Sequence, residues 1–454
     1  MSYNYNIHSL TDWSQIQDTT FLAGLDFSRL ENNFGIHVYK NTYWTAGYVG
    51  VGRLYSHNNT PLQHNGKEEI VLITSQYGMN PWKMLEKVIT DDEYELYVTE
   101  FENSGKFLYK IFYDQPMIKM PPGLDVDGDL LYALNFINSC YRLCYKGLKK
   151  RMILSEENYV SKIKGRIKIN KNLRINTFHG RNDRFYCSYI DFSIDNIENR
   201  IIKSTLLKCK KIIEQRFIFG VESIRRAVFC LNALKNVKEV PIQISDFNRT
   251  SSSGLYIYYK PVLQQAHYIF KQKYYSFNND ITTISKGMYT IPYMINMETL
   301  FEFYARVIIK HVIDSSRYFI DSYSRKWFLK KNTSSINEAE KDIHLFSYCI
   351  PDIVICNKSN NAALFVLDAK YKSNNKTYDP SARNDSHQLL SYVLLTGVSK
   401  CGFIFPGSIT NIKQMNNNQS NFLQINSNVL PDLQYCEIIL GNNPQRDELE
   451  SVFQ

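Results

Sequence analysis

The residues PDIVICNKSNNAALFVLDAKYK, positions 351–372, carry the strongest structural signal in this chain. Two apolar runs rich in β-branched and aromatic residues flank the turn-forming segment NKSNN, a pattern typical of a β-hairpin. With the turn centred on Asn360, Asp352 and Asp368 face each other across the two strands. Because strand side chains alternate between faces, Lys370 lies on the same face as Asp368. The pattern therefore predicts two carboxylates and one ammonium group close together.

Two carboxylates in this arrangement require a positive charge or a shared proton. At about 4 Å and an effective dielectric constant of about 20, two negative charges repel each other by about 4 kcal/mol. Mg²⁺ prefers carboxylate oxygens and keeps several of its waters, so it fits the requirement, and Mn²⁺ is a possible substitute. Such an ion activates water for attack on a phosphodiester, while the Lys370 ammonium positions the water or stabilises the developing charge. An ordinary surface hairpin with a salt bridge is the competing interpretation.

Two flanking helical patterns favour the chemical interpretation. Residues 294–312 repeat apolar side chains at helical spacing, and Glu302 lies on or beside this stripe, where a carboxylate needs a partner or a metal ion. In SHQLLSYVLL, residues 386–395, Gln388 and Tyr392 lie one turn apart on one helix face. Each feature alone is also explained by a partly exposed helix, but their order is that of a PD-(D/E)xK nuclease. The predicted site comprises catalytic Asp352, Asp368, Lys370 and Glu302, with Asp352, Asp368 and Glu302 as metal ligands and Gln388 and Tyr392 as auxiliary residues.

Size and composition restrict the class of protein. A chain of 454 residues exceeds one usual hydrophobic core, and 44% hydrophobic with 21% charged residues excludes a disordered protein. Neither a signal peptide nor an apolar run of about 20 residues is evident, so we expect a soluble cytoplasmic protein. Nine cysteines without CxxC spacing predict buried free thiols. No GxxxxGK[ST] or GxGxxG motif occurs, so we expect no nucleotide on this chain, and a nucleotide-driven motor would be another protein.

A basic segment spans residues 146–184. It contains twelve Lys or Arg and three acids, so its net charge is 12 − 3 = +9. Within it, Lys162, Lys164, Arg166 and Lys168 alternate with three isoleucines and one glycine, which predicts a half-buried strand with four cations on one face. These four residues are the predicted DNA-binding residues. A solvated face, or a bias of composition towards Lys and Asn, explains the charge equally well.

Breaks in the pattern predict three domains. Pro, Gly and Asp concentrate in MPPGLDVDGD, residues 120–129, and a second break precedes IPYMINMETLF. We predict a β-rich amino-terminal domain (1–125), a mostly helical, basic middle domain with the basic strand (126–290), and a nuclease domain (291–454). The nuclease domain would have a central mixed sheet flanked by helices. The overall class is α/β, with an α+β arrangement of the chain as a whole.

With these residues in place, the sequence resembles the McrC family, the nuclease partner of modification-dependent McrBC restriction systems. INMETLFEFYARVI is similar to the family's DMNxLFExFV helix, PDIVI with VLDAKYK resembles its catalytic pair, and HQLLSYV resembles its QxxxY-type helix. KGRIKI, the stretch Cys187–Lys203 and an amino-terminal GYVGVG add to the likeness. One departure is Asn296, where the family usually has Asp at a position expected to orient the helix.

The resemblance implies a Mg²⁺-dependent DNA endonuclease of a 5-methylcytosine-dependent, anti-phage restriction system. Such a subunit docks through its amino-terminal region onto a ring of AAA+ GTPase (or ATPase) subunits, stimulates their hydrolysis and cuts double-stranded DNA. In that scheme the partner usually recognises the modified cytosine. Two alternatives remain open. One is a non-cutting DNA-binding or motor-regulating subunit with a degenerate nuclease fold, and the other is a self-sufficient restriction enzyme with its own readout in the amino-terminal region.

Overall fold

The chain forms two compact units, and one interrupts the other. Unit 1 contains residues 1–128 and 289–454, and unit 2 contains residues 129–288. The segments predicted as the first and third domains therefore lie in the same unit. The computed structural model describes residues 5–453 except 105, 122–127, 278–288, 323–324, 328–348, 373–379, 409, 414–422, 425–432, 443 and 445.

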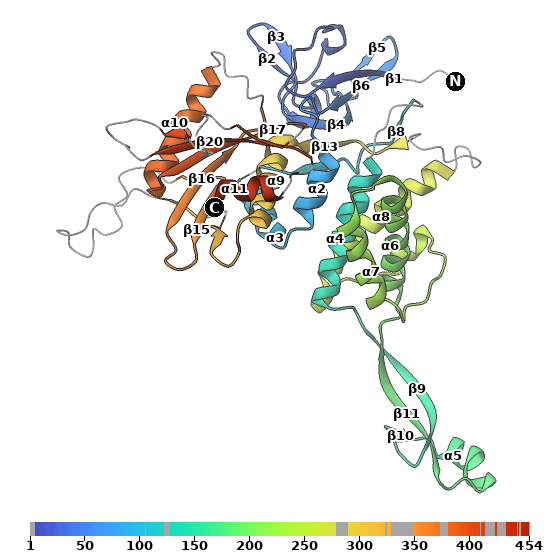
Figure 1. Ribbon diagram of the computed structural model, residues 1–454. Coiled ribbons are helices and arrows are strands. Elements are labelled where there is room, and N and C mark those ends of the chain that lie inside the picture. Colours follow the sequence, from blue (N-terminus) through green and yellow to red (C-terminus); the bar gives the residue numbers. More distant parts are fainter. Residues whose placement is uncertain are drawn as a thin grey trace, which may run out of the picture. The chain divides into compact units, whose positions relative to one another are not determined.

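The amino-terminal part of unit 1 is built on a six-stranded sheet (Figure 1). Its strands are β1 (Tyr5–Thr11), β4 (Tyr48–Arg53), β5 (Gln63–His64), β6 (Lys67–Thr74), β7 (Tyr109–Ile111) and β13 (Tyr293–Asn296). The order is β1-β6-β4-β13-β7, with β5 also paired to β6. β1 and β6 run parallel, and the other pairs are antiparallel. β13 comes from far along the chain and lies between β4 and β7, which makes the two distant segments one unit.

The motif GYVGVG lies in and just before β4, at the centre of this sheet. A Cβ atom on Gly50 would lie 2.1 Å from the carbonyl oxygen of Tyr293, and one on Gly52 would lie 2.1 Å from the Phe34 ring. Both glycines thus permit a close approach that a larger residue would block. Met294 of β13 joins Phe34 in the hydrophobic core of this part. The motif therefore serves the packing of the sheet.

The carboxy-terminal part of unit 1 is built on a seven-stranded mixed sheet. Its strands are β14 (Tyr318–Ile320), β15 (Ile353–Asn357), β16 (Ala363–Ala369), β17 (Lys400–Pro406), β18 (Asn411–Lys413), β19 (Leu423–Gln424) and β20 (Gln434–Leu440). The order is β14-β15-β16-β17-β20-β18, with β19 also paired to β20. β17 runs parallel to both of its neighbours, β16 and β20, and the other pairs are antiparallel. The mixed α/β class predicted from the sequence is confirmed.

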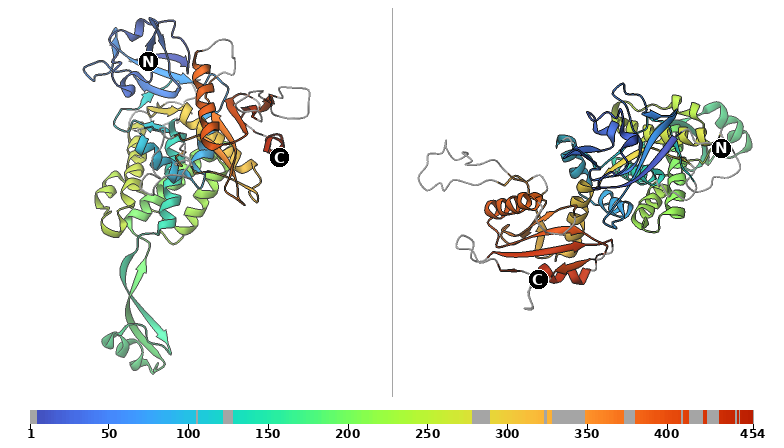
Figure 2. Two further views of the ribbon diagram at one scale, coloured as in Figure 1. Left: turned by 90° about the vertical axis from the view of Figure 1, so that its left-hand side faces the viewer. Right: turned by 90° about the horizontal axis from the view of Figure 1, so that it is seen from above.

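Helices cover both faces of this second sheet (Figure 2). They are α9 (Met297–Val312), α10 (Pro380–Thr396) and α11 (Arg446–Phe453). α10 is the crossover between the parallel strands β16 and β17, and its Val393 shares a core with Val366. On the opposite face of β16, the ring of Phe365 lies 5.5 Å from that of Phe453 on α11. Strand alternation therefore places Asp368, two residues after Val366, on the side covered by α10.

The helix predicted over 294–312 begins only at Met297, because the residues before it form β13. The side chain of Asn296 accepts a hydrogen bond from the backbone N–H of Thr299 at 3.1 Å and so caps α9. Asn and Asp cap helices about equally well. Asn296 therefore still caps this helix, although it departs from the family pattern.

Further elements of unit 1 are η1 (Thr20–Leu22), α1 (Leu30–Asn33), β2 (His37–Tyr39), β3 (Thr42–Trp44), α2 (Pro81–Ile89), α3 (Tyr94–Ser104), β8 (Ile118–Lys119) and β12 (Tyr289–Thr290).

Unit 2 combines a group of helices with a long β-ribbon (Figure 1). Its elements are α4 (Gly128–Lys146), β9 (Arg151–Val160), β10 (Arg166–Ile167), α5 (Ile169–Ile175), η2 (Thr177–His179), β11 (Arg184–Ser193), α6 (Ile197–Arg216), α7 (Val221–Ala233), η3 (Ile244–Arg249), η4 (Gly254–Tyr256) and α8 (Tyr259–Phe277). β9 and β11 are antiparallel and extend away from the helices, with β10 and α5 at the far end. We call β9, β10, α5 and β11 the ribbon. The mostly helical character predicted for this segment agrees with the structure.

The half-buried strand predicted over residues 162–169 is wrong, since only Arg166 and Ile167 are in strand β10. Gly165 has a left-handed φ of 75°, and a Cβ atom there would lie 2.5 Å from the carbonyl oxygen of Ser188. The chain therefore turns at Gly165, and α5 begins at Ile169. The alternation of cations with apolar residues therefore does not correspond to a continuous strand, and the four cations do not share one strand face.

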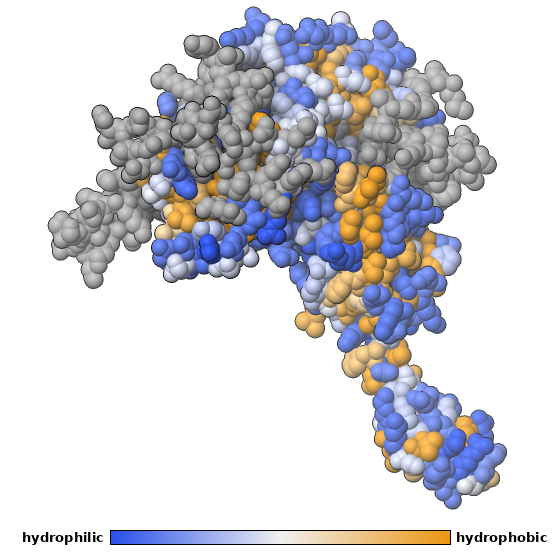
Figure 3. Space-filling model, in the orientation of Figure 1, coloured by the Kyte–Doolittle hydropathy of each residue, from blue (hydrophilic) through white to orange (hydrophobic). Residues whose placement is uncertain are grey.

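Apolar side chains are exposed along the ribbon. Met152 pairs across the strands with Phe192, and Leu154 pairs with Ile190, and each of the four is more than 60% exposed. Figure 3 shows such orange patches on the ribbon and on the helices of unit 2.

All nine cysteines of the chain are free, and seven of them are buried, as predicted. None of the helices that the structure describes is long and apolar enough to cross a membrane.

Candidate active site

The register of the hairpin β15–β16 brings the two predicted aspartates face to face. Ile353 pairs with Leu367 and Val354 with Val366, so Asp352, one position earlier, lies opposite Asp368. The opposition predicted from the sequence is confirmed. A bulge between Ile355 and Cys356 shifts the pairing only towards the turn, and leaves the aspartate end of the hairpin in register.

The turn residues explain this register. The side chain of Asn357 accepts a hydrogen bond from the backbone N–H of Ser359 at 2.8 Å, and its own N–H donates to the carbonyl of Ala362 at 2.9 Å. Asn361 takes a left-handed φ of 55°, which Asn tolerates better than most residues. Local side-chain hydrogen bonds of this kind fix turns. The asparagine-rich turn thus determines where the aspartates meet.

Asp368 is a fully buried carboxylate with incomplete pairing. Its exposed fraction is 0%, and its Oδ2 lies 2.9 Å from Nζ of Lys370. Within the part of the chain that the structure describes, its Oδ1 has no hydrogen-bond partner. Burial, and then the negative charge of Asp352, raise the pKa of Asp368 to about 8, against the lowering effect of Lys370. This environment favours either a proton or a bound cation.

Asp352 is held by the backbone of the opposite strand. Its Oδ2 accepts a hydrogen bond from the N–H of Ala369 at 2.8 Å. The carbonyl oxygen of Asp352 accepts a further hydrogen bond, at 3.2 Å, from the guanidinium of Arg306 on α9, which also donates to the carbonyl of Asp321. Arg306 is only 2% exposed, so it is a buried support of the strand that carries Asp352. Arg306 was not predicted from the sequence, although a cation on the apolar stripe one turn after Glu302 was a usable signal.

Lys370 connects the aspartates to α10. Its Nζ donates to Oε1 of Gln388 at 3.0 Å, and Nε2 of Gln388 donates to the hydroxyl of Tyr392 at 2.5 Å. Burial works to lower the pKa of Lys370, but the charges of Asp368, Asp352 and Glu302 outweigh it and raise the pKa. The group is therefore an ammonium ion at neutral pH. The structure thus joins the predicted auxiliary residues Gln388 and Tyr392 to the predicted lysine.

Glu302 and Glu298 line the α9 side of this site. Glu302 is half-buried, and its charge reaches Lys370. Glu298, one helical turn earlier, also interacts electrostatically with Lys370, although desolvation is the larger effect and raises the pKa of Glu298. Glu298 was not predicted from the sequence, although it stands at the i, i+4 spacing from Glu302 that places two side chains on one helix face.

The site fits a cation held by two carboxylates. Among the described residues, no group of three or more His, Cys, Asp or Glu side chains could hold a metal ion. The predicted trio of Asp352, Asp368 and Glu302 is therefore not assembled, and Glu302 as a ligand stays a prediction. Asp368, with a buried oxygen that lacks a partner, and Asp352 beside it match the needs of Mg²⁺, which commonly binds one or two carboxylates and retains waters.

Tyr371 anchors the chain just after β16 to the amino-terminal part of unit 1. Its hydroxyl lies 2.8 Å from Oγ of Ser75, and its ring meets that of Tyr77 edge-on at 5.0 Å. Asp12 lies near Tyr371, and burial raises the pKa of Asp12 to about 6. Tyr371 directly follows Lys370 and is itself buried. The sequence carried no signal for this contact, since its partners lie some 300 residues apart.

The predicted DNA-binding cations lie at the far end of the ribbon in unit 2. Nζ of Lys162 lies 4.9 Å from the ring centre of Tyr159, and that of Lys164 lies 3.7 Å from the ring centre of Tyr189. Arg166 is exposed. Nζ of Lys168 lies 3.5 Å from Oε1 of Glu156. A role of these residues in DNA binding stays a prediction.

Of three comparisons with known proteins, the first two give little. None of the curated proteins matches the chain. Two solved structures from Thermococcus gammatolerans are similar to it at 12% identity. One contains McrB AAA+ hexamers with bound McrC (TM-score 0.37, covering 99% of each chain), and the other is a McrBC complex (TM-score 0.29, covering 67% of this chain and 87% of that chain).

A family model described as "McrBC 5-methylcytosine restriction system component" matches residues 129–406. This match spans the ribbon and the helices of unit 2, the hairpin with Asp352 and Asp368, and α10 with Gln388. It covers well over half of the 454 residues. The chain therefore belongs to the family of McrBC 5-methylcytosine restriction system components.

Proposed function

We propose that this chain is the nuclease subunit of its restriction system, a Mg²⁺-dependent endodeoxyribonuclease of the PD-(D/E)xK type. The observation that carries the proposal is the state of Asp368, which is fully buried, incompletely paired, opposite Asp352 and in contact with Lys370. Unsatisfied buried carboxylates are costly and are concentrated at functional sites. Membership of a restriction family supports DNA as the substrate.

The fold around the site supports the same proposal. A mixed sheet carries the two aspartates on an antiparallel hairpin, α9 brings Glu302 to the site, and α10 brings Gln388. A central mixed sheet flanked by helices was predicted from the sequence for a PD-(D/E)xK domain, so this arrangement supports the proposal. Rigid strands and helices hold reacting groups more precisely than loops do.

Each residue of the site has a distinct role in this proposal. Asp352 and Asp368 would hold Mg²⁺, which when bound neutralises phosphate charge and makes a water more acidic. Lys370 is an ammonium, so it donates hydrogen bonds to the water or to a phosphate oxygen and does not take up a proton. Gln388 and Tyr392 orient this ammonium through a chain of hydrogen bonds. Arg306 fixes the strand that presents Asp352.

We also infer that the chain works with an AAA+ GTPase or ATPase of the McrB kind. The sequence contains no GxxxxGK[ST] loop, and its family is defined as one component of a restriction system. Docking of the motor through the amino-terminal region is part of this proposal, as the likeness to McrC implies. No membrane is needed for such an assembly, and a cytoplasmic location follows from its proposed substrate.

Plasmid cleavage tests the proposal. Methylated and unmethylated plasmid are incubated with Mg²⁺ and either the wild-type chain or Asp368→Ala, with and without the neighbouring motor and GTP. Asp314→Ala is the matched control, because Asp314 is an aspartate of the same unit whose side chain is 45% exposed. We expect cleavage that requires both Asp368 and the motor and survives Asp314→Ala. Equal activity of wild type and Asp368→Ala would refute the nuclease and leave a non-cutting, regulatory subunit as the better explanation.

A further inference from the structure

Trp13, in the turn after β1, combines an exposed side chain with a strained backbone. Its φ is 49°, in the left-handed region that a bulky residue rarely adopts. The residue is 36% exposed, and among the described residues no hydrogen bond or ring contact holds its indole. Strain of this kind persists only where the surroundings enforce it, and it is concentrated at binding and catalytic sites.

The turn that carries Trp13 is fixed on both sides. The backbone N–H of Ser14 donates to Oγ1 of Thr45 at 2.9 Å. Oδ1 of Asp12 accepts a hydrogen bond from the backbone N–H of Gln76 at 2.8 Å. Asp12 and Thr45 are both 0% exposed, so these contacts are buried. The neighbours of Trp13 therefore hold the strained conformation in place, and its indole is presented on a rigid support.

The indole lies beside the α9 wall of the candidate active site. A Cβ atom on Gly47, the first glycine of GYVGVG, would lie 2.8 Å from Nε1 of Trp13 and 3.1 Å from Cγ of Glu298. The two side chains thus lie over the same glycine, where a larger residue would displace one of them. Glu298 is exposed and interacts electrostatically with Lys370. The ring of Trp13 therefore borders the site that contains Lys370.

The same turn also meets the chain that follows β16. Asp12 lies near Tyr371, the residue directly after Lys370. The carbonyl of Gly47 accepts a hydrogen bond from the N–H of Met297, the first residue of α9, at 2.8 Å. The turn with Trp13 is thus attached to both elements that frame the site. This attachment keeps the ring at a constant place relative to the aspartates.

The charge of the site gives an exposed, uncharged ring a use. Asp352, Asp368, Glu298 and Glu302 are four carboxyl groups around one ammonium, that of Lys370. A DNA strand carries a negative charge at each phosphate, so ionised carboxylates on this surface repel it. An aromatic ring attracts a nucleotide without any charge, because bases of every kind stack on it. Trp13 can therefore offset part of the repulsion.

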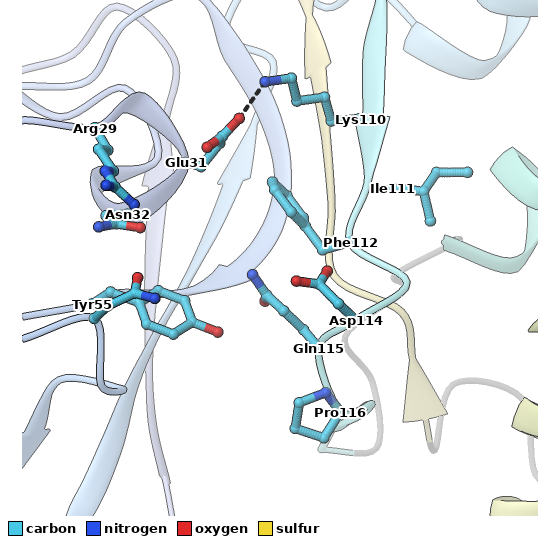
Figure 4. Close-up of a pocket in the computed structure, with 11 residues that line it drawn as sticks. Arg29, Glu31, Asn32, Tyr55, Lys110, Ile111, Phe112, Asp114, Gln115 and Pro116 are labelled. Atoms are coloured by element: carbon cyan, nitrogen blue, oxygen red, sulfur yellow. Dashed lines mark hydrogen bonds and ion pairs between the residues drawn. The ribbon is translucent and has the colours of Figure 1, made fainter.

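A polar cavity of about 500 Å³ is a second feature of the amino-terminal part of unit 1. It shares no residue with the candidate active site, and Lys110 on its rim is already paired with Glu31 at 2.5 Å (Figure 4). Nothing in its walls selects one ligand. Trp13, in contrast, lies beside a site with a proposed substrate.

We propose that Trp13 is a DNA-binding residue of the nuclease site, and that its indole stacks on an unpaired base of the strand that is cut. The inference rests on the proposed nuclease function, which identifies DNA as the substrate. The ring would hold the strand against the acidic wall of the site while Asp352 and Asp368 meet the phosphate through Mg²⁺. Because stacking accepts every base, Trp13 supplies affinity and position without sequence preference.

Tryptophan fluorescence tests the contact directly. The chain has four tryptophans, so Trp13→Phe removes one of them and keeps an aromatic ring in its place. The full chain is titrated with a single-stranded oligonucleotide of thymines in Mg²⁺, without the motor. We expect the oligonucleotide to quench part of the wild-type fluorescence, and Trp13→Phe to bind within about threefold of wild type but to lose most of this quenching. Equal quenching in both chains, or no binding by the wild type, would overturn the proposal.

Removal of the ring tests its contribution to affinity. Trp13→Gly suits this purpose, because glycine adopts a left-handed backbone without strain. We expect it to weaken binding of the same oligonucleotide about tenfold in fluorescence anisotropy, as the loss of one stacked base does. Tyr39→Ala, at a more exposed aromatic residue of the same unit, is the control and should change nothing. Wild-type affinity in Trp13→Gly would refute the contact, and if this variant fails to fold, the quenching in Trp13→Phe decides.

Gly47→Ala tests the place of the ring. The φ of Gly47 lies outside the left-handed region, so alanine fits the backbone while its methyl group displaces the indole. We expect Gly47→Ala to weaken binding several-fold in the wild-type background and to have no further effect in the Trp13→Gly background. An equal loss in both backgrounds would refute the placement of Trp13 beside the site.

These outcomes separate this inference from the nuclease itself, which Asp368→Ala decides. If the Trp13 variants change binding and quenching but no chain cuts, the DNA contact stands and the nuclease fails. If the wild type cuts and Trp13→Gly binds and cuts equally well, the inference alone fails. A Trp13→Gly chain that binds DNA normally but no longer stimulates the motor would make the ring a protein contact, which also refutes the inference.

Discussion

The candidate active site of unit 1 and the ribbon of unit 2 both carry charged side chains, but in opposite surroundings. Asp368 is fully buried, and a backbone or side-chain contact fixes each of its neighbours. On the ribbon, Lys162 and Lys164 lie on the surface against tyrosine rings and remain in water. Burial strengthens electrostatic interactions and raises the cost of an unpaired charge, whereas exposed charges are screened. A single substitution should therefore matter far more in the site than on the ribbon.

The largest expected effect is the loss of Lys370, the half-buried ammonium between Asp368 and Gln388. We expect Lys370→Ala to reduce plasmid cleavage on the order of 100- to 1,000-fold, as the removal of one fixed donor does in other enzymes. The matched control is Lys372→Ala, two residues further on, whose ion pair with Asp385 lies outside the chain of contacts to Asp368. Cleavage rates under single-turnover conditions measure both. Equal loss in the two variants would contradict a specific role of Lys370.

The second effect is an increase in stability. Asp368→Asn removes a buried negative charge, so without divalent cations the variant should melt at a higher temperature than the wild type. The folded-state pKa of Asp368 is raised to about 8, well above its ordinary value of 3.8. Folding therefore favours the protonated form, and the wild type loses stability as pH rises from about 4 through 8.

Melting curves in EDTA between pH 5 and pH 9 measure this effect. The advantage of Asp368→Asn should grow over this range, and Mg²⁺ should reduce it by stabilising the wild type alone. If the variant melts below the wild type at pH 9, the buried carboxylate of Asp368 has stabilising partners that the structure does not contain. That outcome would also remove the contrast between the buried site and the ribbon.

An intermediate effect is expected at Tyr371, which follows β16 and joins it to Ser75. Tyr371→Phe removes one buried hydrogen bond and should cost about 1 kcal/mol of stability in denaturant unfolding. Because Lys370 is the preceding residue, we also expect a cleavage rate several-fold lower with unchanged DNA affinity. Tyr39→Phe is the control, since Tyr39 is more than half exposed. Full activity in Tyr371→Phe would mean that the strand end is held without Ser75.

The smallest effect per residue is expected on the ribbon. Lys164→Glu and Lys168→Glu should weaken DNA binding in a salt-dependent way, and each lost phosphate contact should reduce the slope of log Kd against log salt by about 1. Lys211→Glu, at an exposed position of α6 in the same unit, applies the same charge change as a control. Fluorescence anisotropy over a salt series measures the slope. An affinity that does not depend on these charges at any salt concentration would leave the ribbon without a DNA-binding role.

Short-range rules predicted much of the site. The two-residue period of strands and the turn NKSNN sufficed to predict that Asp352 faces Asp368 with Lys370 beside it, and the structure confirms this geometry. The spacing of Gln388 and Tyr392 likewise predicted a shared helix face, and a hydrogen bond joins them. Their catalytic roles stay predictions. These inferences worked because each depends on residues within one helix or one hairpin.

The supports of the site depend on long-range contacts and were not predictable in this way. Arg306 and Tyr371 hold the hairpin β15–β16 through partners on other elements, which no local period encodes. On the ribbon, a local pattern gave a wrong prediction. The alternation around Gly165 predicted a strand, but the chain turns at that glycine. A local pattern specifies a strand only when a partner strand is present to pair with it.

The position of β13 also determines when the amino-terminal sheet can be completed during synthesis. β4 and β7 leave the ribosome early, but the strand that joins them ends at Asn296 and follows all of unit 2. Until then both strands present open edges, which are prone to pair with other chains. The nascent protein must therefore protect this gap through the translation of some 180 further residues, and chaperone demand should be greatest in that interval.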